Sequence, residues 1–234
     1  MKILSMDSSA QTASVAVLED GRLLAEYTLN NGNTHSETLL PMVEGMLAAL
    51  GLKISDIDLF ACSAGPGSFT GVRIGAATVK GLAFASGKPC AGVSTLHAIA
   101  RNTVLREGLI CPVMNARRSQ VYTALFRSDG ERLTRLMPDS AMAISELDGI
   151  LAEYGESVTF CGDGYDITVE NIKKTKYIPT PERLRYQSAV SVAEAALEEY
   201  SDGSFPSDLE LTVNYLRPSQ AERERASRLA EGKN

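Results

Sequence analysis

The sequence predicts an α/β protein built from a duplicated unit. Two observations support this. Strand-like and helix-like runs alternate, and each half follows the order strand, turn, strand, Asp-Gly turn, strand, helix, strand. The halves also align at particular residues: Met6-Asp7 corresponds to Met114-Asn115, and Asp20-Gly21 corresponds to Asp129-Gly130. Chance similarity between two short α/β halves is the alternative explanation.

In the first half, short apolar runs rich in β-branched residues mark the strands, and turn residues separate them. Thr34 or Ser36 can cap the first helix, which Gly51 follows, and the loop Gly65–Gly71 joins a buried strand to the second helix. The predicted strands are Lys2–Met6, Thr12–Leu18, Arg22–Leu29, Ile57–Ser63 and Cys90–Val93, and the predicted helices are Thr34–Leu50, Val72–Ser86 and Thr95–Val104.

The second half repeats this order with fewer helices, and its last part is separated by the turn-rich stretch Ser201–Ser207. We expect two subdomains, residues 1–104 and 105–218, followed by a charged and mobile tail at 219–234. The predicted strands are Leu109–Met114, Gln120–Arg127, Glu131–Leu136, Val158–Cys161 and Leu209–Tyr215, and the predicted helices are Ile144–Tyr154 and Ser188–Tyr200.

Composition restricts the classes of function. The chain has 234 residues and a net charge of −6, with 29 acidic against 23 basic side chains. Such a chain is not expected to grip nucleic acid unaided, because Lys and Arg contacts to phosphate drive that binding. Only two histidines occur, His35 and His97, so a self-contained His-rich metal centre is excluded. Each is interpreted as a capping or surface histidine.

The cysteines indicate a reducing compartment. They form no CxxC pair and lie in apolar runs, which is typical of reduced core thiols rather than a disulfide framework. Asp7 interrupts the N-terminus before a signal-peptide core forms, and no apolar run reaches the roughly 18 residues of a membrane span. We therefore expect a cytoplasmic protein without membrane association. The four cysteines are Cys62, Cys90, Cys111 and Cys161.

Asp7, Ser8 and Ser9 follow the first strand and form the first candidate for chemistry. A carboxylate and two hydroxyls can orient a metal-bound phosphate or a water molecule. They can equally cap their own turn through Asx and Ser hydrogen bonds, and the tripeptide alone favours the turn.

The loop Gly65–Gly71 is the second candidate, because a strand leads through glycines into a helix start, where free N–H groups favour an anion. The loop does not match the Walker pattern, since Gly71-Val72-Arg73 replaces Gly-Lys-Ser/Thr. It does not match a nucleophile elbow either, because Pro66 and Thr70 stand where glycines are needed, so Ser68 is a poor nucleophile. A phosphate cradle and a simple strand-to-helix joint both stay open. The residues concerned are Gly65, Gly67, Ser68 and Gly71.

The helices predicted at Thr34–Leu50 and Val72–Ser86 carry few charges and appear too apolar to bury only one face. The small residues of the second helix permit close helix packing. Two explanations stay open: the apolar faces pack on each other and on the sheet, or they form an interface with another subunit. The candidate interface residues are Leu39, Val43, Met46, Leu47, Leu50, Arg73, Ala76, Ala77, Lys80, Ala83 and Phe84.

The thirteen-residue string Ser63–Gly75 resembles the signature of the bacterial TsaB family, also called YeaZ. Four other segments are similar in order and spacing, and the match covers most of the chain, most strongly its first half. They are Ile3–Ser9, His35–Pro41, Ala116–Tyr122 and Tyr215–Arg217.

The resemblance implies an actin-like/Hsp70-like (ASKHA) fold of two duplicated ribonuclease-H-like subdomains, the second reduced. It also implies a non-catalytic scaffold and activator of TsaD, which transfers threonylcarbamoyl to the adenosine beside the anticodon of tRNAs that read codons starting with A. TsaE would join the assembly, and a homodimer would form when TsaD is absent. The tRNA would be bound only through the complex, and ATP and metal would belong to the partner subunits, with no cofactor in this chain.

Two departures from the related patterns bear on this. The His-x-x-x-His metal site of TsaD would fall on Thr95 and Ile99, so the resemblance implies an accessory subunit and not the transferase. Asn115 stands where the family usually has Asp, which weakens any phosphate or metal role there. An autonomous ATP-dependent phosphotransferase using Asp7 and Gly65–Gly71 is the alternative function, and a serine peptidase is a more remote one.

Overall fold

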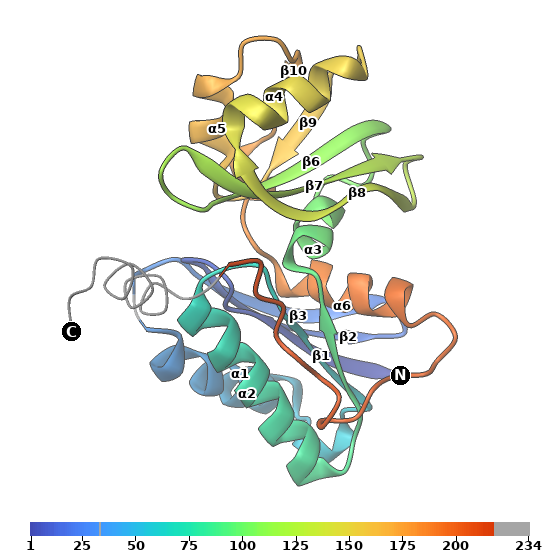
Figure 1. The fold of residues 1–234 in the computed structure, drawn as a ribbon. Coiled ribbons are helices and arrows are strands. Elements are labelled where there is room, and N and C mark those ends of the chain that lie inside the picture. Colours follow the sequence, from blue (N-terminus) through green and yellow to red (C-terminus); the bar gives the residue numbers. More distant parts are fainter. Residues whose placement is uncertain (33, 218–234) are drawn as a thin grey trace, which may run out of the picture.

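Two mixed β-sheets organise the protein, and a computed structural model describes residues 1–32 and 34–217 of it (Figure 1). The tail expected at 219–234 lies outside these residues. The elements of the first half are β1 (Lys2–Asp7), β2 (Ala13–Glu19), β3 (Arg22–Leu29), α1 (His35–Leu50), the 3-10 turn η1 (Ile54–Asp56), β4 (Leu59–Ser63), α2 (Phe69–Ser86), β5 (Cys90–Val93) and α3 (Thr95–Arg101).

The second half repeats the topology of the first. Its elements are β6 (Gly108–Asn115), β7 (Gln120–Ser128), β8 (Leu133–Ala143), α4 (Ile144–Glu153), β9 (Val158–Cys161), α5 (Tyr165–Asn171), β10 (Tyr177–Ile178), the 3-10 turn η2 (Glu182–Leu184) and α6 (Ala189–Glu199). The sheets run in the orders β3-β2-β1-β4-β5 and β8-β7-β6-β9-β10. In each sheet the first three strands are antiparallel and the last two run parallel to the first. The predicted duplicated α/β fold is confirmed.

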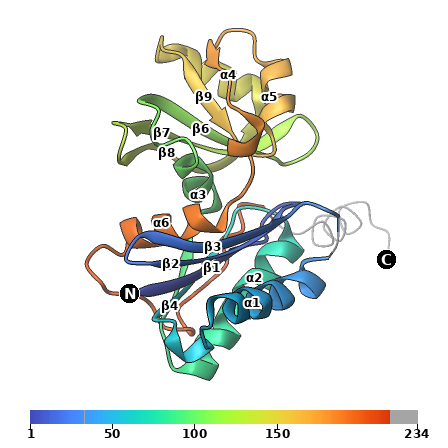
Figure 2. The ribbon, with the colours of Figure 1, turned by 180° about the vertical axis from the view of Figure 1, so that it is seen from behind.

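The layers alternate from one end of the molecule to the other (Figures 1 and 2). Helices α1 and α2 cover one face of the first sheet, and α6 covers the other. Helix α3 lies against the inner face of the second sheet, where Leu96 and Ile99 pack with Ile110 and Phe126. Helices α4 and α5 cover the outer face of the second sheet. The central strands of each sheet are therefore buried on both faces, as their near-continuous apolar sequences require, whereas the residues of the edge strands β3 and β8 are half-buried or exposed.

Helix α6 returns to the first half. It falls within the range expected for the second subdomain (105–218), but Ala189, Val192 and Ala196 pack on Ile3 and Leu59 of the first sheet. The chain after α6 stays there too, and the buried Leu211 joins the core beneath α1 and α2. The expected range therefore does not describe the packing, because the apolar face of α6 fits the first sheet.

Three local differences from the predicted elements have physical causes. Helix α2 begins at Phe69 and not at 72, because the Ser68 hydroxyl caps it by accepting the Gly71 N–H at 3.2 Å. The strand predicted at Leu209–Tyr215 is wrong: this segment forms no ladder, and the Asn214 N–H instead donates to the Ala64 carbonyl at 2.7 Å. Helix α5 was missed, since its seven residues are too short to show a period.

The prediction of core thiols is confirmed. All four cysteines are free and buried. Burial raises the pKa of Cys90 to about 11 and that of Cys111 to about 12, so these thiols stay protonated at neutral pH.

Candidate functional site

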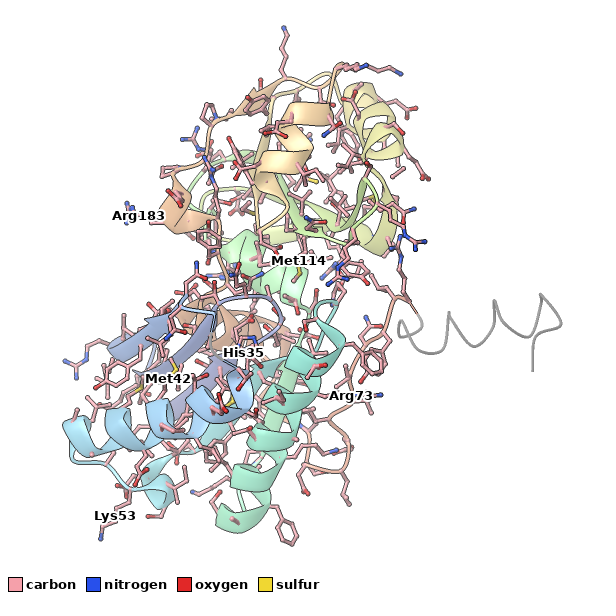
Figure 3. All side chains as sticks on the ribbon, turned by 90° about the vertical axis from the view of Figure 1, so that its left-hand side faces the viewer. His35, Met42, Lys53, Arg73, Met114 and Arg183 are labelled. Atoms are coloured by element: carbon pink, nitrogen blue, oxygen red, sulfur yellow. The ribbon has the colours of Figure 1, made fainter. Side chains whose placement is uncertain are left out.

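A cleft of about 680 Å³ opens between the halves, where β1, β4, β6 and β9 end. Ligands of α/β sheets bind beyond the carboxyl ends of the strands, so this cleft is the candidate site. Met114 stands at the junction, on the wall formed by the second half (Figure 3). The lining residues are Ser9, Ala10, Gln11, Pro66, Gly67, Ser68, Phe69, Thr70, Met114, Asn115, Ala116, Arg117, Tyr122, Asp163, Asn214, Tyr215, Leu216 and Arg217.

Asp7, the last residue of β1, does not line this cleft. It is 1% exposed, and both carboxylate oxygens are already used inside the protein. Oδ1 accepts the Ser9 N–H at 2.8 Å and the Ser9 hydroxyl at 2.7 Å, and Oδ2 accepts the Ser63 hydroxyl. Burial raises the pKa of Asp7, and these hydrogen bonds oppose that shift. A general base or metal ligand needs an accessible oxygen, which Asp7 does not offer.

The glycine loop packs against the chain's own backbone. A Cβ on Gly67 would lie 2.5 Å from the Ser9 carbonyl oxygen, and one on Gly71 would overlap the Ser8 carbonyl oxygen. The Ser8 hydroxyl donates to the Gly71 carbonyl at 2.9 Å, and the Ser68 N–H donates to the Ser9 carbonyl at 2.6 Å. The seven residues predicted as a phosphate loop are thus brought together, but Gly67 and Gly71 accommodate the β1–β2 turn, and Gly65 accommodates the backbone of Asn214.

The second half contains the counterpart of this joint. The Asn115 side-chain oxygen accepts the Arg117 N–H at 2.8 Å, as Asp7 does with the Ser9 N–H. Gly162 and Gly164 replace Gly65 and Gly67: a Cβ on either would collide with the backbone of residues 113–115. The alignment of the two halves therefore extends to individual hydrogen bonds.

Asp163, between those two glycines, is a site residue that sequence reasoning missed. Its carboxylate opens on the cleft and interacts with the Asn115 N–H. The surrounding walls nevertheless raise the pKa of Asp163 to about 6, because they exclude much of the water that would stabilise its charge. The signal was available: Gly162-Asp163-Gly164 occupies the place of Gly65-Pro66-Gly67.

The β6–β7 turn holds an unusual backbone. Arg117, Arg118 and Ser119 are consecutive left-handed residues, with φ of 64°, 54° and 56°. This conformation costs an L-residue roughly 1–2 kcal/mol, so the surrounding contacts must fix it. The Gln120 N–H donates to the Arg117 carbonyl at 3.1 Å, and the Ile144 N–H donates to the Ser119 carbonyl at 3.2 Å.

The last described residues join the two halves across the cleft mouth. The Arg217 guanidinium donates to the Ala116 carbonyl at 3.3 Å and to the Gln120 side chain. The Tyr215 ring lies 4.8 Å from that of Phe69, and its hydroxyl accepts from Arg73 Nε at 2.5 Å. Arg73 also lies over the Phe69 ring. This use of the Tyr215–Arg217 motif was not predicted.

The structure divides the predicted interface residues into an inner and an outer set. Six of the apolar ones pack into the chain's own core, so they are not accessible to a partner. Leu50 and Lys80 are half-buried, and Lys80 donates to the Leu211 carbonyl at 3.1 Å. Arg73, Ala77 and Phe84 are exposed on α2. The buried set is Leu39, Val43, Met46, Leu47, Ala76 and Ala83.

The two histidines have structural partners. His35 Nε2 lies 2.7 Å from the Ala10 carbonyl, and His97 stacks on Phe126 with its Nε2 3.3 Å from Glu198. Within residues 1–32 and 34–217, no group of three or more His, Cys, Asp or Glu side chains is arranged to hold a metal. None of the helices in those ranges combines the length and apolar character needed to cross a membrane.

Comparison with known proteins places this fold in a family. Residues 22–202 match the model of TsaD, the tRNA N6-adenosine threonylcarbamoyltransferase family. A Bacillus subtilis tRNA threonylcarbamoyladenosine biosynthesis protein, TsaB, is 33% identical over 75% of this chain and 78% of its own length. The Escherichia coli protein of that name is 37% identical over 55% of this chain and 56% of its own length.

A solved structure gives the same result. YeaZ from Pseudomonas aeruginosa superimposes with a TM-score of 0.78 at 25% identity, covering 92% of this chain and 99% of that one. The fold expected from the sequence resemblance is therefore confirmed.

Proposed function

The chain belongs to the TsaB (YeaZ) family, and from this premise we propose that it is a non-catalytic adaptor in the synthesis of tRNA threonylcarbamoyladenosine. It joins and activates a TsaD-type transferase, which modifies the adenosine next to the anticodon in the cytoplasm. The observation that carries the proposal, beyond family membership, is the outer surface of α1 and α2.

Most of this surface consists of small and apolar side chains on two adjacent helices, although Glu44 is also exposed on α1. Leu40 on α1 is 52% exposed, and Phe84 on α2 is 79% exposed. Between them lie exposed small residues that allow another helix pair to approach closely. They are Gly45, Ala48, Ala49, Ala77, Gly81 and Ala85. We define these eight residues as the α1–α2 face. A TsaD-type partner covers this face in the complex, and a second copy of the chain covers it when that partner is absent.

The absence of catalysis is supported by the polar side chains of the first half near the cleft, which are already bonded within the protein. Asp7 is buried against Ser9 and Ser63, and Ser68 is occupied as a helix cap. The chain needs no cofactor of its own in this proposal: ATP and metal are bound by the partners, among them the ATP-binding TsaE. The tRNA is bound only by the assembled complex.

Copurification with a TsaD-type partner tests the proposal. Ala77→Glu puts a charge on the α1–α2 face, and we expect at least 100-fold weaker association, since burying an unpaired charge costs about 3 kcal/mol or more. Ala85→Glu should act alike, whereas Ser145→Glu, exposed on α4, is the matched control. Ala76 is unsuitable, because it is 4% exposed and a charge there would disrupt the chain's own core.

The outcome that contradicts the proposal is equally defined. Association that survives both Ala77→Glu and Ala85→Glu refutes the assignment of the α1–α2 face. Turnover of Mg-ATP by the isolated chain would instead indicate an autonomous phosphotransferase.

A further inference from the structure

The left-handed turn presents two arginines that have no side-chain partner among the residues that the structure describes. Arg117 and Arg118 are exposed, and among residues 1–32 and 34–217 neither guanidinium has a carboxylate partner or accepting oxygen. By contrast, Arg101, Arg127 and Arg185 are all paired with acids. Within the described part of the chain, a strained backbone therefore carries two cations that have no partner there.

The turn is rigid before any ligand arrives. The Arg117 N–H is held by the Asn115 side chain, and the Ala116 N–H donates to the Gln120 carbonyl at 3.0 Å. Arg217 fixes the turn from the opposite side through the Ala116 carbonyl and the Gln120 side chain. A preformed backbone reduces the ordering entropy that binding would otherwise require. The strained backbone persists only because several contacts enforce it, which is typical of a preorganised binding site.

The surroundings of the turn indicate the class of ligand. Arg117 and Arg217 line the cleft together with the rings of Phe69, Tyr122 and Tyr215. Arginines beside aromatic rings are typical of surfaces that bind an RNA backbone and its unstacked bases. At about 680 Å³ the cleft is too small for a folded protein but can take one nucleotide.

We propose that the turn Arg117–Ser119 contacts the phosphate backbone of the tRNA once the chain has joined its partner. This proposal rests on the proposed function, which supplies the tRNA. Guanidinium groups bind phosphate oxygens through paired N–H donors, and each such contact releases counterions from the RNA. Two contacts are too few for binding by a chain of net charge −6 alone, so they act as an addition to the partner's own contacts.

The test is tRNA binding by the reconstituted complex across a range of salt concentrations. The probe is an unmodified tRNA transcript that reads a codon starting with A. Each lost phosphate contact makes the slope of log K against log salt shallower by about 0.9. Arg117→Ala/Arg118→Ala should therefore make it shallower by about 1.8, which corresponds to roughly 60-fold weaker binding at 0.1 M salt.

Two further variants keep the result interpretable. Arg117→Lys/Arg118→Lys preserves both charges and should preserve the slope, whereas a purely structural turn would not distinguish lysine from alanine in this way. Arg106→Ala/Arg183→Ala removes two exposed arginines elsewhere and should leave the slope unchanged. Figure 3 shows Arg183 and Arg73 at opposite sides of the molecule.

Each outcome decides the question. Unchanged slope and affinity in the double alanine variant overturns the proposal, and so does an equal loss in the control. If the double alanine variant instead loses its protein partner while the remaining complex keeps its salt slope, the turn docks an acidic protein surface and the tRNA assignment is wrong. A chain that does not join the transferase at all refutes the proposed function itself, which the same copurification reveals.

Discussion

Replacing Asp7 by asparagine tests whether this carboxylate is structural or chemical. Its Oδ1 accepts two hydrogen bonds from Ser9, at 2.8 and 2.7 Å, and its Oδ2 accepts one from Ser63. Asparagine retains an oxygen for Ser9, and its NH₂ can donate to the Ser63 hydroxyl if that hydroxyl turns. The second half shows that the substitution is compatible with the turn, because Asn115 makes the equivalent backbone bond at 2.8 Å.

The expected loss of stability follows from these hydrogen bonds. Asp7→Ala removes the acceptor of three buried donors, and each unpaired donor costs about 1–3 kcal/mol, so the free energy of unfolding should fall by roughly 3–9 kcal/mol. Asp7→Asn keeps an acceptor for both Ser9 donors and removes only the acceptor of the Ser63 hydroxyl, so we expect a loss of about 1–3 kcal/mol. The order of stability is then wild type, Asn and Ala, with Ala lowest.

The pH dependence provides an independent check. Burial raises the pKa of Asp7, so the folded chain holds this proton more tightly than the unfolded chain, whose pKa is near 3.8. The contribution of Asp7 to stability is complete below that unfolded value and is lost as pH rises through the folded pKa. Asparagine does not titrate, so the stability of Asp7→Asn relative to wild type should rise with pH above about 4.

Urea denaturation from about pH 4.5 to about pH 8 measures both effects, and threonylcarbamoyladenosine formed by the reconstituted complex measures function. The adaptor role predicts normal modification with Asp7→Asn. A variant that is folded and joins its partner but supports no modification would show that Asp7 acts chemically, and the reasoning would be refuted.

Three further substitutions test separate parts of the structure. Gly67→Ala places a carbon 2.5 Å from the Ser9 carbonyl oxygen, and should lower the free energy of unfolding in urea by about 2 kcal/mol or more. The added carbon of Gly81→Ala meets nothing within 4 Å, and this variant should raise the free energy of unfolding by up to about 1 kcal/mol. Equal effects of the two substitutions would contradict the packing argument. Arg118→Gly relieves a left-handed residue and should raise the free energy of unfolding by about 0.5–1 kcal/mol after the added chain entropy of glycine, while weakening tRNA binding by the complex; a destabilised variant would show that the turn is unstrained. Asp163→Asn removes a carboxyl whose pKa the cleft raises to about 6. The stability that this protonated carboxyl contributes to wild type is lost as pH rises from about 4 through 6, so the thermal stability of the variant relative to wild type should increase over that interval. Parallel pH curves would show that the carboxylate is fully solvated.

The duplication could be predicted because it is encoded locally. The Asp-Gly turns after residues 19 and 128 and the polar residue ending β1 and β6 determine their own neighbourhoods, so the sequence order reveals them. The start of α2 was missed for the opposite reason. Gly71 suggests a loop, but it lies in the first turn of α2. It is a glycine because the Ser8 carbonyl leaves no room for a side chain. That requirement comes from a turn more than sixty residues away.

The interface prediction relied on how many apolar residues the two helices contain, and not on which face of the helix each residue occupies. Val43, Met46, Leu47 and Leu50 follow Leu39 by 4, 7, 8 and 11 residues, which is the spacing of a single buried stripe. Their large number suggested two large apolar faces, whereas most of the exposed apolar residues on the outer face are glycines and alanines, with Leu40 and Phe84 as the large ones. The path of α6 back to the first sheet was equally hidden, because periodicity identifies an apolar face but not the sheet that it will cover.

The two halves use the same turn in different ways, and this difference bears on the function of the cleft. In the first half, the side chains of Asp7 and Ser8 bond only to the protein, so one wall offers little for chemistry. In the second half, Asn115 preserves the backbone bond, and the next two residues are exposed arginines on a strained backbone. A catalytic cleft needs accessible groups on both walls at once. Here the charged side chains that line the cleft, Arg117, Asp163 and Arg217, all lie on the second wall and at the mouth. This one-sided arrangement favours the proposed contact with a large anionic partner over chemistry on a small enclosed ligand.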